Sequence, residues 1–449
     1  MGAAYGLRTS VADGRTARPR SGAPLGVPGL DLTAVLPRAA RVAASPHAWL
    51  LAVGLGAYTW FATIGWNVPY PGALPFGPLW TAATAAVIAL WVVTGRAITP
   101  AAAIALGSVA AMTLTDVSYL ASQGLRDLHL YLRAGQHFLD GRPVYLDALF
   151  TTRPADLADY PFLYPPLTLP FFGALSRLPA AVVDVGWLAS SVAAAVVTLR
   201  LFGVRWIAVP VLLLWPPFFQ GIQVGNVAIP LGLLFALAPW VGAGLVVAAI
   251  FKIYSGIAAL WLVREGHTRE LAVGLAIVVL LAAATLPLVG IGLWAGWWHG
   301  LGLFRQSQPL LADSLYGLGL PHYLPDWLAL TVAAVLAVAA LRSRGRDGLA
   351  RLGLVTAIAS PSLYAHGLIV ALPAFLSLRS LWLWTVLAIT SVSPGIGWWA
   401  AILLGVAAWG VPALRRDTAE AADPLHPLPY GAAPWPAAHL RGSGPLPET

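Results

Sequence analysis

One segment of this 449-residue chain concentrates side chains able to do acid–base chemistry. Residues 121–160 are the most polar stretch of the interior and hold five of the 18 acidic residues in less than a tenth of the length. A positioned carboxylate can take a proton from an acceptor hydroxyl. The five carboxylates belong to Asp127, Asp140, Asp147, Asp156 and Asp159.

Other reaction classes lack their residues. The chain has no cysteine, which excludes disulfides and thiol nucleophiles, and it has neither an H-E-x-x-H nor a G-x-x-x-x-G-K-[ST] motif. Glycosyl transfer from a lipid phosphate needs less, because a sugar phosphate already carries a good leaving group. One carboxylate base and cationic groups around the phosphate suffice, whereas glycoside hydrolysis needs two carboxylates.

Four residues have both a catalytic and a structural interpretation. Asp127 is a general base or a solvated helix cap, and His366 is its neighbour or a core histidine bonded to a carbonyl. Lys252 is the only lysine among 26 basic residues and lies in the apolar run V-V-A-A-I-F-K-I-Y. It either binds a donor phosphate or extends to the membrane interface. Arg133 binds the same phosphate or a lipid headgroup.

Three further polar or aromatic residues are candidates for substrate contact. Tyr164 touches substrate or, with Pro165 and Pro166, sets the entry angle of the next span. Gln223 and Asn226 bind sugar hydroxyls or join helices to each other.

Composition places these residues in a membrane protein. Hydrophobic residues make up 59% of the chain and charged residues only 10%, against about a quarter in soluble domains. Residues 271–281 (LAVGLAIVVLL) are apolar on every side, unlike a barrel strand. We therefore expect an all-α polytopic integral membrane protein with about 11 to 14 transmembrane helices.

Charge fixes the expected orientation. Arginines flank the apolar runs and mark the cytoplasmic side, which makes nucleic acid a poor candidate partner for this chain of net charge +8. Residues 1–47 and 413–449 are expected to be disordered tails around a spanning domain at 48–412. Three apolar runs (48–66, 78–95 and 99–120) then carry the chain to the outside.

The outer face should hold the acidic segment and two more features. Residues 121–160 form the outer loop, with a surface helix before Gly141 that carries Leu128, Tyr131, Leu132 and Phe138 at helical spacing. A Trp-rich loop at 291–325 and the S-P-S-L-Y-A-H stretch at 360–366 lie on the same side. The remaining apolar runs are expected at 162–178, 180–199, 205–220, 226–240, 242–262, 269–290, 326–342, 349–361, 364–378, 381–393 and 396–412.

The acidic loop contains D-L-H-L-Y-L-R-A-G-Q-H-F-L-D-G-R-P-V-Y at 127–145, and F-L-Y-P-P-L follows at 162–167. These two stretches resemble the signature of glycosyltransferase family 87. S-P-S-L-Y-A-H is similar to a further family element, with Tyr364 where a Trp is usual and Gly367 where a second His is common. G-I-Q-V-G-N at 221–226 resembles a G-Q-x-N element with different spacing.

The resemblance implies a GT-C-type enzyme in which Asp127 is catalytic, His366 lies beside it and Tyr131 belongs to the D-x-x-x-Y element. The family includes polyprenyl-phosphate-mannose-dependent α-1,2-mannosyltransferases. The resemblance therefore implies inverting transfer of a hexose, namely mannose, from a polyprenyl-phosphate donor to a glycolipid or glycan acceptor outside the plasma membrane. No nucleotide sugar, cofactor or obligatory metal is expected. The family has one span before its catalytic loop, and this chain has three apolar runs there.

Two other functions remain open from the sequence. A transporter or flippase of lipid-linked saccharides would place ionisable residues along a path through the bilayer, whereas the acids here gather at one face. A non-catalytic envelope scaffold would keep the fold without transfer.

Overall fold

The regular secondary structure of the described residues is helical. The computed structural model describes residues 32–43, 76–94, 99–120, 124–151, 160–311, 317–392 and 395–416. Within these ranges the only β-type pairing is an isolated bridge between Leu378 and Arg415, which confirms the all-α class. The predicted run at 48–66 and most of both predicted tails lie outside the described residues, whereas residues 32–43 form a helix within the expected N-terminal tail.

The helices follow the order of the apolar runs. The first half contains α1 (Leu32–Ala43), α3 (Phe76–Thr94), α4 (Pro100–Leu120), α5 (Arg126–Leu139), α6 (Asp147–Thr151), η2 (Pro166–Thr168), α7 (Leu169–Ser176), α8 (Ala180–Leu201), η3 (Trp206–Ala208), α9 (Val209–Leu214), α10 (Pro216–Gln223) and α11 (Ala228–Ala236). The second half contains α12 (Ala243–Val247), η4 (Ala248–Ile250), η5 (Ile253–Ala259), α13 (Leu260–Glu265), α14 (Thr268–Leu311), α15 (Leu320–Tyr323), α16 (Asp326–Ala340), α17 (Gly345–Ile358), η6 (Ala365–Ala371), α18 (Leu372–Leu376), α19 (Ser380–Val392), α20 (Ile396–Ala407) and η7 (Pro412–Leu414).

Three of these helices, α4, α8 and α14, contain segments long and apolar enough to cross a membrane. The 22 residues of α8 extend about 33 Å, which matches the hydrocarbon core of a bilayer. Its side chains at Val182 and Val185 are 60% and 68% exposed, as expected for a surface that contacts lipid. The polytopic architecture is confirmed. The count of 11 to 14 spans stays a prediction, since six further apolar helices are only 10–17 residues long.

Two predicted spans are broken rather than continuous. Residues 206–214 and 216–223 meet at a 64° bend, because Pro216 holds the preceding Trp215 in an extended conformation (ψ 132°). The run at 242–262 divides into four short helices, with extended backbone at Lys252 (φ −133°, ψ 103°). Non-helical backbone is tolerated at membrane depth only where protein or a water-filled cavity surrounds it.

The segment 291–311 differs from the predicted outer loop, because α14 continues as a helix to Leu311. Its path changes at Gly290, which has φ 68° and ψ 162°, a conformation open to glycine. The indole N–H of Trp297 donates to the carbonyl of Leu163 (3.0 Å) and its ring is 5% exposed. Trp297 therefore packs inside the protein, whereas Trp298, 69% exposed, suits an interface anchor.

The helix predicted before Gly141 is present as α5, and it ends where Gly141 predicts. Gly141 has φ +66°. Its N–H donates to the carbonyl of Phe138 (3.2 Å), and the N–H of Arg142 donates to that of His137 (2.8 Å). These two bonds form a Schellman motif. Leu128 and Tyr131 are buried, so the apolar face of α5 packs against protein.

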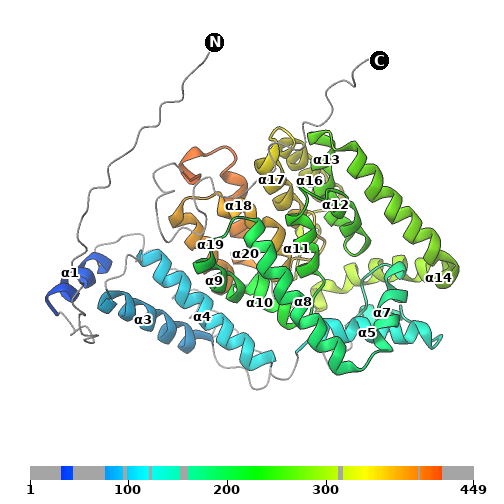
Figure 1. The fold of residues 1–449 in the computed structure, drawn as a ribbon, viewed down its shortest axis with the longest axis horizontal. Coiled ribbons are helices and arrows are strands. Elements are labelled where there is room, and N and C mark those ends of the chain that lie inside the picture. The colour runs from blue at the N-terminus through cyan, green and yellow to red at the C-terminus, as the bar shows by residue number, and fades with distance from the viewer. Residues whose placement is uncertain are drawn as a thin grey trace, which may run out of the picture.

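Helices α5 and α7 lie together at one end of the molecule, away from α13 and α17 (Figure 1). They cross at two glycines. A Cβ on Gly135 would lie 2.3 Å from the backbone nitrogen of Gly173, a distance that no side chain can occupy. This close approach fixes the tilt of α5 against the rest of the fold.

Gly135→Ala is therefore expected to destabilise the protein by about 1–3 kcal/mol, because the added methyl overlaps backbone atoms. The measurement is the melting temperature of the detergent-solubilised protein. Gly186→Ala in α8 is the matched control, since a Cβ there meets nothing within 4 Å. Equal melting temperatures for the two variants would contradict the packing described here.

Candidate active site

The N-terminus of α5 is attached to a turn formed by residues 223–226. The backbone N–H of Asp127 donates to the carbonyl of Val224 (2.8 Å), and that of Leu125 donates to Gln223 (2.7 Å). Leu125 has φ 55°, the only positive φ of a non-glycine residue in the described ranges. Such conformations persist only where surrounding contacts enforce them, and the 223–226 turn supplies those contacts.

Both oxygens of the Asp127 carboxylate are held. Asn226 donates from Nδ2 to Oδ2 (2.6 Å), and Arg126 donates from Nε to Oδ1 (3.0 Å). The side chain is 14% exposed. Asn226 is itself fixed, because its Oδ1 accepts the N–H of Ala228 (2.8 Å) at the start of α11. The carboxylate is therefore oriented from two sides and still partly open.

Gly225 allows the 223–226 turn to approach α5. Its φ is +70°, and a Cβ there would lie 2.9 Å from Cβ of Leu128. The indole N–H of Trp187 in α8 donates to its carbonyl (3.0 Å). The G-I-Q-V-G-N stretch thus places Asn226 beside Asp127 across 99 residues of sequence.

Tyr131 and Tyr164 form a buried pair next to this carboxylate. Their hydroxyls are 2.8 Å apart and their rings pack edge to face with centroids 5.0 Å apart. Burial raises the pKa of both tyrosines well above the usual value, and the negative charge of Asp127 raises each further. Both hydroxyls therefore stay protonated and can donate hydrogen bonds.

His366 lies at the start of η6. Its ring stacks on Tyr364 with centroids 5.8 Å apart and planes 8° apart. A Cβ on Gly221 would lie 3.2 Å from Cβ of His366, so the histidine packs directly on α10. His366 interacts electrostatically with Lys252 and Arg126. The structure therefore brings His366, Lys252 and the neighbour of Asp127 to one region.

Not every predicted residue reaches this region by a described contact. The side chain of Gln223 donates to the backbone carbonyl of Asp116 in α4 (3.2 Å), which fits the helix-joining interpretation. Its sugar-binding role stays a prediction. Arg133 lies in α5, two residues after Tyr131, and its predicted phosphate contact is likewise untested.

Sequence reasoning missed three aromatic or cationic residues of the site. Arg126 contacts Asp127 directly, and its guanidinium lies 5.8 Å from the ring centroid of Tyr160. Tyr254, two residues after Lys252, interacts electrostatically with Tyr164. Adjacency to Asp127 was the available signal for Arg126, whereas Tyr160 and Tyr254 had no distinguishing pattern.

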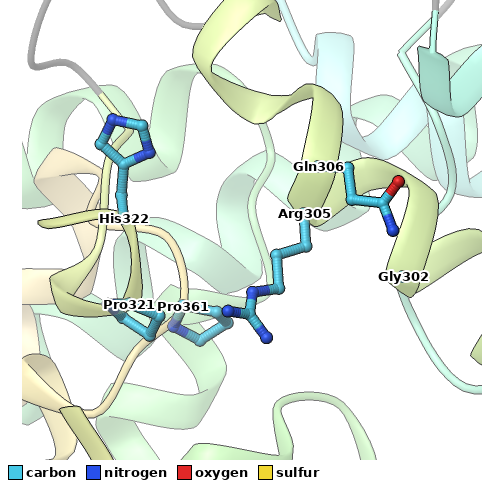
Figure 2. A pocket seen from close by; sticks show the side chains of 6 residues that line it. All are labelled: Gly302, Arg305, Gln306, Pro321, His322 and Pro361. Carbon is cyan, nitrogen blue, oxygen red and sulfur yellow. The ribbon is translucent and has the colours of Figure 1, made fainter. Parts of the chain in front are cut away.

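A cavity of about 430 Å³ lies beside the loop that carries His366. Its lining includes Arg305 and Gln306 of α14, His322 of α15 and Pro361. Figure 2 shows the Arg305 side chain extending from α14 toward Pro321 and Pro361. The loop is attached to the segment before α15, because Gly317 and Leu363 exchange backbone hydrogen bonds of 3.0 and 3.2 Å.

Among the described residues, no three histidine or acidic side chains lie together as a metal site would require. Operation without a metal stays a prediction.

The tyrosine pair yields a stability test. Tyr131→Phe and Tyr164→Phe should each cost about 1 kcal/mol, because each removes the shared hydrogen bond, and the double variant should cost less than the sum. Folding raises the pKa of both tyrosines, so the free energy of unfolding includes a contribution from keeping their hydroxyls protonated. This contribution is complete below pH about 10, the ordinary pKa of tyrosine, and is lost as the pH rises above it. Each Phe variant should weaken that alkaline loss. Denaturation at several pH values measures both effects, and strict additivity would contradict the pairing.

Comparison with known proteins identifies the family of one segment of the chain. Residues 162–365 match the model of glycosyltransferase family 87. The match contains Tyr164, Asn226 and Lys252, begins after Asp127 and ends one residue before His366. No curated protein and no solved structure matches the chain.

The matched segment is joined to the residues outside it by specific contacts. Asn226 bonds to Asp127, and Tyr164 bonds to Tyr131. The acidic loop and the matched segment therefore form one site. The chain carries a glycosyltransferase family 87 domain over residues 162–365 and is a membrane glycosyltransferase.

Proposed function

We propose that the protein transfers a hexose, specifically mannose, from a polyprenyl-phosphate donor to a glycolipid or glycan acceptor on the outer face of the plasma membrane. The observation that carries the proposal is the Asp127 carboxylate, which Asn226 and Arg126 hold in a fixed orientation. Asp127 lies in the first turn of α5, at one end of a fold that contains membrane-spanning helices.

In this reaction Asp127 is the general base. It accepts the proton of the acceptor hydroxyl as that oxygen forms a bond to the anomeric carbon. The bond from that carbon to the phosphate oxygen breaks, and polyprenyl phosphate leaves with the electron pair. A single displacement of this kind inverts the anomeric configuration. Because the phosphate is a good leaving group, no second carboxylic acid is required.

Cations beside the carboxylate support phosphate binding. Lys252 and Arg126 both interact electrostatically with His366, so positive charge gathers where the donor phosphate would develop negative charge. Lys252 lies at a break in the helix, where the backbone is extended. Arg133 in α5 is the second predicted phosphate ligand.

The cavity at Arg305, Gln306 and His322 is the proposed acceptor entrance. Polar side chains line it, and Pro361 places it five residues from His366 along the same loop. A sugar acceptor needs such a polar approach, whereas the polyprenyl chain needs contact with lipid. The two substrates would then reach Asp127 from different directions.

Asp127→Asn is expected to lower kcat for transfer by about 10²–10⁴-fold, the range that general-base catalysis contributes. The assay is sugar transfer from polyprenyl-phosphate-mannose by the purified protein, with the melting temperature checking that the fold persists. Asp184→Asn is the matched control, since Asp184 bonds to His129 at the same end of the molecule (2.9 Å) and should not affect kcat.

Full transfer activity in Asp127→Asn would overturn the assignment of the base. Movement of the lipid-linked sugar across liposomes without a new glycosidic bond would favour the transporter, and the absence of both activities in the wild type would favour a scaffold.

Asn226 offers a separate test of how the base is positioned. Asn226→Ser should keep a side-chain oxygen able to cap α11 but cannot reach Asp127, so we expect kcat to fall by up to about 100-fold with little change in KM. Asn226→Ala should lose the same activity and also about 0.5–2 kcal/mol of stability. Transfer kinetics and thermal denaturation separate the two effects. An Asn226→Ser variant with wild-type kcat would show that Asp127 needs no such support.

A further inference from the structure

A second cavity, of about 720 Å³, lies among α17, α18 and the segment after α20. We propose that it binds the phosphate headgroup of an anionic phospholipid in the cytoplasmic leaflet. Four arginines line it, and we call it the arginine pocket: Arg346, Arg379, Arg415 and Arg416. Asp347 is the one acid of the lining, so these side chains carry a net charge of +3.

The arginine pocket is a built structure rather than a group of surface side chains. The N–H of Arg379 donates to the carbonyl of Leu414 (3.0 Å), and the N–H of Arg416 donates to that of Ser377 (3.0 Å). Leu378 and Arg415 form the isolated antiparallel bridge. The backbones of three of the four arginines are therefore fixed by pairing between the end of α18 and the end of η7. The guanidinium of Arg415 donates to the Asp347 carboxylate (2.8 Å).

The pocket and α5 lie at opposite ends of α8. Helix α8 connects the two ends, because Asp184 near its start bonds to His129 of α5 and Leu201 at its end lines the pocket. The 17 residues between them rise about 26 Å. Figure 1 likewise shows α5 and α7 at one end and α17 and α18 toward the other. Arginine enrichment marks the cytoplasmic face, so the pocket opens toward the inner leaflet.

The lining suits a lipid phosphate better than a metabolite. Guanidinium groups bind phosphate oxygens in bidentate fashion, and basic pockets between transmembrane helices on the cytoplasmic side bind anionic headgroups. Phe202, Trp240 and Leu376 supply apolar surface in the same cavity. Trp240 is 44% exposed, as expected where a side chain meets the membrane interface.

The binding does not depend on the transfer reaction, so it can be tested without donor or acceptor. Purified full-length protein is titrated with phosphatidylglycerol or phosphatidylcholine and the retained lipid is counted by native mass spectrometry. Wild type should retain phosphatidylglycerol preferentially. Arg346→Gln and Arg416→Gln should each weaken retention about fivefold. Arg269→Gln, an exposed arginine at the start of α14 outside the pocket, should leave it unchanged.

Two further arms identify the ligand. Glycerol 3-phosphate and inorganic phosphate should displace phosphatidylglycerol only weakly, because neither fills the apolar part of the pocket. If either compound displaces phosphatidylglycerol at a concentration similar to that of the lipid, the lipid is not the ligand and the pocket binds a soluble phosphate. Equal retention of the two phospholipids by wild type, or equal loss in Arg269→Gln, would overturn the pocket itself, whether or not the arginine variants fold.

Discussion

The hydrogen bond between Asn226 and Asp127 is the interaction on which the site depends, because it joins two segments that are 99 residues apart in the sequence. One part is a short helix with a single catalytic candidate, and the other is the turn between α10 and α11. The backbone bonds from α5 to Val224 and Gln223 hold the helix in register, and Asn226 then sets the direction of the carboxylate. A carboxylate held in this way loses little entropy when substrate binds.

Broken helices are what make this junction possible. Regular transmembrane helices satisfy all their backbone groups internally and leave none to bind a neighbour. The bend before Pro216 and the extended backbone at Lys252 expose polar backbone and side chains within an otherwise apolar fold. Helix α10, which follows the first break, packs on His366 at Gly221, and Lys252 at the second break interacts electrostatically with His366. The cost of interrupting a helix is thus confined to the region that needs polar groups.

The few charges of the chain divide between the two ends of the spanning helices. Around Asp127 they are mixed in sign and close together, which suits proton transfer next to a phosphate. Around Arg379 and Arg415 they are predominantly positive, which suits a headgroup and also opposes movement of that end through the bilayer. Helix α8 links both environments, so a single element sets the distance between them.

The sequence by itself determined the class of the protein, because apolar runs and sparse charge depend only on composition and order. It also determined α5 and its end at Gly141, since helix periodicity and a left-handed glycine are local properties. It did not determine that residues 291–311 are helical, that Arg126 contacts Asp127, or that Gln223 binds α4 while Asn226, three residues later, binds the carboxylate. Those outcomes depend on how distant segments pack, and long-range contacts such as that between Asn226 and Asp127 leave no periodic pattern in the chain. Only the tertiary structure decided which of many scattered polar residues meet.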